Sequence, residues 1–187
     1  NVPVALPRVR INRDVITPED KRERALKQRL AAAGLTEIIT MSFGSSAANA
    51  QAGVSAGPPN DSNGNNAATA AMVTLMNPLS ENYAGMRTSL IPNLLQTLER
   101  NVRYGASRAA LFELGPVYRQ SESGGEDAPN QETHLALGLM GSSAQAHWGA
   151  QVRAFDMYDL MGFIESAFAD SGKTISFAAA EAYYVQP

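Results

Sequence analysis

The chain has 187 residues, of which 44% are hydrophobic and 18% charged, as in a soluble globular protein of about one domain. It has no cysteine, which excludes disulfides, thiolate metal sites and cysteine nucleophiles, and which fits a cytoplasmic protein. No apolar run reaches the ~18 residues that a membrane span needs, so we expect no membrane partner.

The net charge of −3 is distributed unevenly along the chain. Residues 1–29 carry eight Lys or Arg and four Asp or Glu, whereas residues 30–187 carry seven and fourteen. Such a basic run is usually the solvated face of a helix, and a nucleic-acid-binding segment is the alternative.

The first segment, residues 1–16, is expected to be a linker or the end of a preceding domain. Pro3 and Pro7 interrupt it, and proline cannot donate to a β-ladder. The opening residues do not have the layout of a signal peptide, and both ends resemble cuts in a longer chain.

A helix is predicted from Thr17 to Ala33. Thr17 provides the N-cap, Asp20 completes an acidic capping box, and Gly34 ends the helix. The helical spacing of Leu26, Leu30 and Ala33 predicts an apolar stripe that is buried on one face.

A strand is predicted from Thr36 to Phe43, where β-forming residues dominate. The core therefore begins at residue 17 and is expected to run to residue 187. It is interrupted at about residues 44–71 by a low-complexity insertion of Ala, Gly, Ser and Asn, which cannot bury enough apolar surface to offset its ordering entropy.

The remaining pattern alternates strands and helices. The predicted strands are Met72–Met76, Ala110–Leu114, Val117–Arg119, Thr133–Met140 and Thr174–Phe177, and the predicted helices are Pro92–Tyr104 and the segment after Asp156. The helix at Pro92 has its apolar residues at Leu94, Leu95, Leu98 and Val102. Strands joined by hairpins, with helices between some of them, indicate an α+β fold on a mainly antiparallel sheet.

The residues alone predict no catalytic centre and no metal site. His134 and His147 lie far apart without ligand-spaced partners. Asp156 and Asp159 form a carboxylate pair, but they stand where the start of a helix needs hydrogen-bond acceptors, so we interpret them as a capping box.

Four segments, in order, resemble the β chains of bacterial phenylalanyl-tRNA synthetases. The first reads Met-Arg-Thr-Ser-Leu-Ile-Pro-Asn-Leu-Leu and follows Asn-Pro-Leu-Ser; the second reads Leu-Phe-Glu-Leu-Gly-Pro-Val-Tyr. The third reads His-Leu-Ala-Leu-Gly-Leu-Met-Gly, and the fourth contains His-Trp-Gly. They occupy Met86–Leu95, Leu111–Tyr118, His134–Gly141 and His147–Leu160, and the likeness extends over the whole chain.

The resemblance implies a fold like that of class II aminoacyl-tRNA synthetases, an antiparallel sheet flanked by helices. Its first signature, a helix and a strand that build a subunit interface, matches residues 17–43. Its second, a strand pair joined by a loop, matches residues 111–119 and 133–140. The third signature is not visible before the chain ends.

The resemblance also implies a scaffold without catalytic residues of its own. Arg87 and Arg119 are the only candidates for vestigial ATP contacts, and Arg119 is followed by Gln-Ser-Glu where an active member needs a nearby glutamate. The full enzyme would use ATP and Mg²⁺, an α subunit in an αβ heterotetramer, and tRNA(Phe). Candidate subunit-interface residues are Arg22, Leu26, Lys27 and Leu30.

Two alternatives to this scaffold remain open. One is an ATP-binding class II ligase-like domain, in which Arg87 and Arg119 hold phosphate; the other is a free-standing tRNA-binding module that uses its basic start. Similarly, the stripe of the first helix either faces a partner or packs only against this chain's own sheet, which is the common use of an amphipathic helix.

Overall fold

A computed structural model describes residues 16–45, 47, 72–120, 129–144, 148–149, 152–169, 171–172 and 174–177. The predicted linker before Ile16, nearly all of the predicted insertion and the tip of the hairpin at 121–128 lie outside these residues. No helix in the described ranges is long and apolar enough to cross a membrane.

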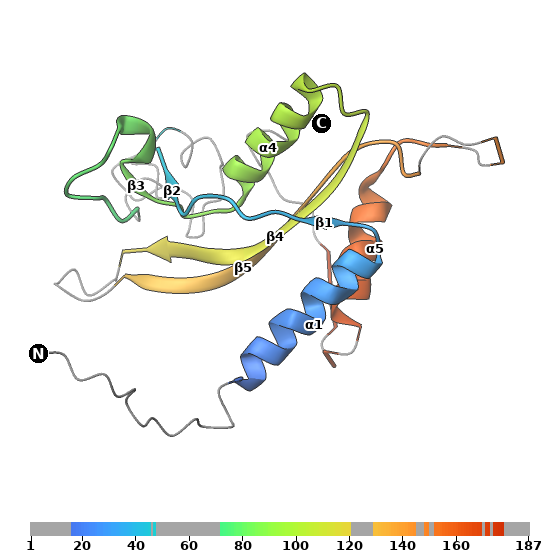
Figure 1. The fold of residues 1–187 in the computed structure, drawn as a ribbon. Helices are drawn as coiled ribbons and strands as arrows, with labels where there is room; N and C mark the ends of the chain where they lie inside the picture. The colour runs from blue at the N-terminus through green and yellow to red at the C-terminus, as the bar shows by residue number, and fades with distance from the viewer. Residues whose placement is uncertain are drawn as a thin grey trace, which may run out of the picture.

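The centre of the fold is a long hairpin of β4 (Arg108–Arg119) and β5 (Asn130–Gly141) (Figure 1). The strands pair antiparallel from Arg108↔Gly141 to Arg119↔Asn130, which confirms the predicted pairing of 111–119 with 133–140. This register places alternate β4 residues on opposite faces of the sheet.

The predicted break at Gly115-Pro116 is wrong, because β4 runs through it without interruption. Phe112 accepts a bond from Ile38 N through its carbonyl, and Tyr118 N donates to the Arg87 carbonyl, so the backbone groups of these even-numbered residues point away from β5. Pro116 has the same orientation, and its missing N–H therefore leaves the β5 ladder intact.

The sheet is mixed rather than antiparallel throughout. A short β1 (Thr36–Glu37) lies parallel to β4, with Thr36 opposite Leu111 and Glu37 opposite Phe112, so the strand order is β1-β4-β5. A hairpin forces its two strands to be antiparallel, but the long connection between β1 and β4 does not.

Three further strand predictions need correction. The predicted strand at Thr36–Phe43 is divided into β1 and β2 (Phe43–Gly44), and β2 pairs antiparallel with β3 (Gly85–Met86). Met72–Met76 contributes only an isolated bridge, Thr74↔Gly85. Thr174–Phe177 is not part of any strand among the described residues. A β-rich sequence forms a strand only where a neighbouring backbone is available to pair with it.

Helix α1 (Pro18–Ala32) begins at the predicted capping box: Asp20 N donates to Thr17 Oγ1 at 3.1 Å, and Thr17 N donates to Asp20 Oδ2 at 2.8 Å. Leu30 is buried and Leu26 half-buried, as predicted. Ala33 is exposed, which corrects the predicted stripe. It is the C-cap, so the helical period ends there, and Leu35 enters the core instead.

Helix α4 (Ile91–Arg103) follows a short 3₁₀ turn, η1 (Glu81–Tyr83). Leu94 is buried and Leu98 packs beside it, but Leu95 and Val102 are exposed, so the predicted apolar stripe is too wide. A Cβ at Gly138 would lie 2.9 Å from Leu98 Cδ1, so the glycine allows α4 to approach β5 closely.

Helix α5 (Met157–Phe168) begins at Asp156, whose side chain accepts from Asp159 N at 3.1 Å, while Asp156 N donates to Asp159 Oδ2 at 2.9 Å. This confirms the predicted capping box. Arg153 donates two bonds of 2.6 Å to Asp159, and these bonds, together with the Asp156 amide, lower the pKa of Asp159 to about 2.

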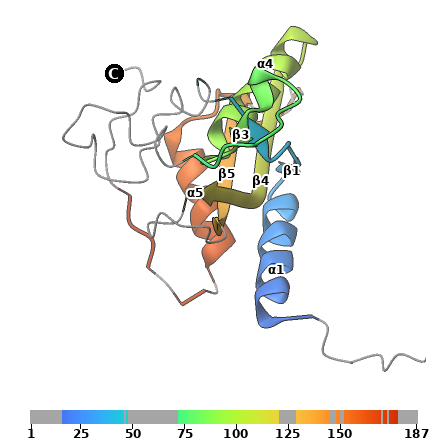
Figure 2. The ribbon, with the colours of Figure 1, turned by 90° about the vertical axis from the view of Figure 1, so that its left-hand side faces the viewer.

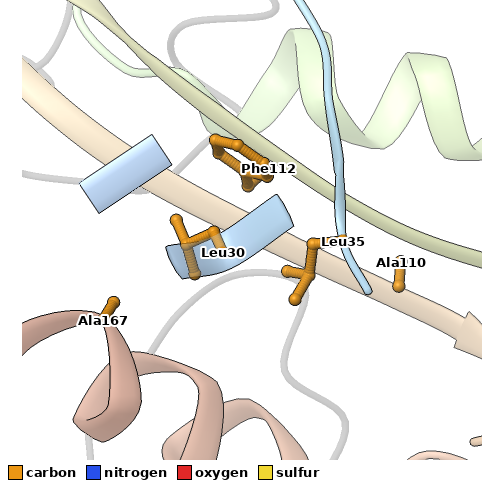
Figure 3. Close-up of a cluster of buried hydrophobic side chains, with 5 residues drawn as sticks. All are labelled: Leu30, Leu35, Ala110, Phe112 and Ala167. Atoms are coloured by element: carbon orange, nitrogen blue, oxygen red, sulfur yellow. The ribbon is translucent and has the colours of Figure 1, made fainter. Parts of the chain in front are cut away.

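The helices form a layer on each face of the sheet: α1 and α5 lie against one face and α4 against the other (Figures 1 and 2). Figure 3 shows the larger cluster, in which Phe112 and Ala110 of β4 meet side chains of α1, α5 and the turn after α1. The neighbouring β4 residues Ala109 and Leu111 pack on the α4 face. The segment 109–112 of β4 is thus packed against helices on both faces of the sheet.

Candidate functional site

Arg87, one of the two arginines singled out by the sequence, is buried beside residues 113–116 of β4, with 3% of its surface exposed. It donates from Nε to the Pro116 carbonyl at 2.8 Å. Its Nη1 donates to Thr40 Oγ1 at 2.8 Å and to Glu113 Oε1 at 2.7 Å. These acceptors come from two segments of the chain, so a single guanidinium ties them together.

Glu113 is equally buried, at 2% exposure, and Arg87 is not its only partner. Thr40 donates to its carboxylate twice, from the backbone N to Oε1 at 3.1 Å and from the hydroxyl to Oε2 at 2.8 Å. A buried ion pair is tolerated when further hydrogen bonds satisfy its charges, and this pair meets that condition.

The backbone of Arg87 occupies a gap between two segments of the sheet. Arg87 N donates to the Ser42 carbonyl, and the Arg87 carbonyl accepts from Tyr118 N, both at 2.9 Å. The chain at β1 therefore lies next to β4, but by residue 42 it is separated from β4 by Arg87. We call this divergence the fork and define it as residues 38–42, Arg87 and Glu113.

The fork explains why the predicted strand at Thr36–Phe43 is divided, because Thr40 bonds to the Glu113 side chain and Ser42 bonds to Arg87 instead of to β4. Gly115 is required beside it, since a Cβ there would lie 2.6 Å from Arg87 Nη2. The next residues of the motif, Thr88 and Ser89, are buried at 6% and 4% exposure. Residues 87–89 of the motif are thus part of the protein interior.

Arg119, the second arginine candidate, is the last residue of β4 and lies half-buried opposite Asn130. The bond between Tyr118 N and the Arg87 carbonyl brings the two arginines close along the backbone. The guanidinium of Arg87, however, is directed at Thr40, Glu113 and Pro116. Chemically, the arrangement holds strands together and does not present two arginines to a ligand.

The four interface candidates on α1 have different surroundings. Leu30 is buried in this chain's own core, and Leu26 packs at its edge. Lys27 Nζ lies 2.6 Å from Glu37 Oε1 and so joins α1 to β1. Arg22 is well exposed and lies 3.7 Å from Glu19. A cavity of about 460 Å³ between α1 and α5 is lined by Arg22, Ala25, Leu26, Arg29, Ala167, Phe168 and Ser171.

The exposed edge of the fork is a feature that sequence reasoning missed. Ile39 is 89% exposed and Met41 56% exposed, whereas Ile38 N and Thr40 N donate inwards. Periodicity could not have found it, because residues 38–41 read Ile-Ile-Thr-Met and the polar Thr40 points inwards. The same segment borders a cavity of about 480 Å³, lined by Thr40, Met41, Phe43, Tyr83, Asn93, Gln96, Thr97, Glu99, Arg100 and Arg103.

Of the two histidines, only His134 lies within the described residues, and no metal-binding group surrounds it there. His134 Nε2 lies 3.1 Å from Glu132 Oε2 on the surface, and His147 lies outside the described ranges. In the part of the chain that the structure covers, no group of three His, Cys, Asp or Glu residues is placed to hold a metal ion.

Comparison with known protein families shows to which family this chain belongs. Residues 2–187 match the family described as "Phenylalanyl tRNA synthetase beta chain CLM domain". The chain belongs to the phenylalanyl-tRNA synthetase β-chain family. The match extends over both strands of the hairpin and all three described α-helices, so the family assignment applies to the whole described fold.

Curated relatives carry the name "Phenylalanine--tRNA ligase beta subunit". The protein from Syntrophus aciditrophicus is 33% identical over 93% of this chain, and that from Geobacter sulfurreducens is 32% identical over 98%. The matched regions are 20% and 22% of those proteins, so the chain spans about a fifth of these β chains. Their name describes each of them as one subunit of a ligase.

Solved structures with the same fold include two of pyrrolysyl-tRNA synthetase from Desulfitobacterium hafniense. One has a TM-score of 0.53 at 18% identity and covers 83% of this chain and 47% of that one; the other has a TM-score of 0.54 at 19% identity and covers 81% and 46%. At this identity the likeness concerns the fold alone, an α+β arrangement that the chain shares with these synthetases.

Proposed function

We propose that this β-chain module is a non-catalytic scaffold and subunit-interface domain of phenylalanine–tRNA ligase. In this proposal the full enzyme is an αβ heterotetramer in the cytoplasm that attaches phenylalanine to tRNA(Phe) with ATP and Mg²⁺. The α subunit carries out adenylation and transfer, and this module holds its own sheet in a fixed shape against that subunit.

The observation that supports this most directly is the use made of Arg87. Binding ATP and its metal requires several convergent charges in an accessible site. Arg87 is buried and directed at Glu113, Thr40 and Pro116, so its charge is balanced within the protein. Arg119 is left as one candidate cation, and one cation does not organise a triphosphate.

The two alternatives receive less support. An ATP-binding domain would need Arg87 at the surface. A free-standing tRNA-binding module would need a continuous basic face, but on α1 Arg22 lies beside Glu19 and Lys27 beside Glu37.

Phenylalanine-dependent exchange between pyrophosphate and ATP tests the proposal. The full-length β chain alone is expected to give background exchange, and the αβ complex is expected to be active. Arg119→Ala in the β chain should leave the exchange rate of the complex within about twofold, because a scaffold arginine does not stabilise the transition state.

Exchange by the β chain alone that disappears with Arg119→Ala would contradict the proposal and identify an active site. Thermal denaturation of the Arg119→Ala complex provides the control, since an unstable complex would lose activity for another reason.

A further inference from the structure

We draw no further inference here: the strongest candidate, the outer edge of β5, which ends the β1-β4-β5 sheet of the described residues and where a further strand of the β chain would pair, restates an established property of this family's sheet.

Discussion

Replacing Glu113 by alanine is expected to lower the free energy of unfolding by about 3–5 kcal/mol, because it leaves a buried cation without its partner. Arg87 and Glu113 are 3% and 2% exposed, and their nearest atoms are 2.7 Å apart. The substitution also removes the acceptor of two bonds from Thr40. Urea unfolding monitored by circular dichroism measures the change.

The chain contains a matched control for this substitution. Glu99 and Arg103 form an arginine–glutamate pair on the surface of α4, with 59% and 74% of their side chains exposed. Glu99→Ala is expected to change the free energy of unfolding by at most about 1 kcal/mol, because water and ions screen an exposed pair. Similar losses for Glu99→Ala and Glu113→Ala would show that the buried network does not stabilise the fold as described.

Replacing Leu30 by aspartate is expected to cost at least about 4 kcal/mol. The change removes a buried apolar side chain and puts an unpaired carboxylate in its place. Leu30 is 1% exposed and packs in the cluster with Phe112 and Ala167 (Figure 3). A loss of this size approaches the whole stability of many domains, so the variant should be largely unfolded at 37 °C.

Gln28→Asp provides the control on the same helix, because Gln28 is exposed. It introduces the same residue into α1 and should cost less than about 1 kcal/mol. Thermal unfolding of both variants distinguishes the two positions. A Leu30→Asp chain as stable as the Gln28→Asp chain would contradict the placement of Leu30 in the core.

The parts of the fold that the sequence predicts well depend on residues close together in the chain. Each capping box joins residues three positions apart, Thr17 with Asp20 and Asp156 with Asp159. The β4–β5 hairpin follows from two β-rich runs around a short polar loop. Local hydrogen-bonding and periodicity rules are sufficient for such features.

The fork shows why the rest could not be predicted. Glu113 is 26 residues from Arg87 and 73 from Thr40, and Thr40 is 47 from Arg87. No local pattern indicates that these three side chains meet. Arg87 looked like a ligand because the family motif marks it, and only the tertiary contacts reveal its buried partners. The same holds for Ile39, whose exposure depends on how Thr40 is held.

The helical periodicity of the sequence predicted burial correctly for some helix residues and wrongly for others. Leu30 and Leu94 lie in the core because the helical period places them on its face. Ala33 and Leu95 do not, since α1 ends before Ala33, and Leu95 is one residue away from the buried Leu94 and so lies on another side of α4. Among the interface candidates, Arg22 is exposed, Leu26 and Lys27 are half-buried, and Leu30 is buried.

Hydrogen–deuterium exchange of the full-length β chain, measured alone and with the α subunit, tests the central claim that this module is an interface. The account predicts slower amide exchange in peptides covering residues 36–44 when the α subunit is bound. The β5 strand, which is already paired with β4, should change little. Protection confined to the β chain outside this module, with residues 36–44 unchanged, would contradict it.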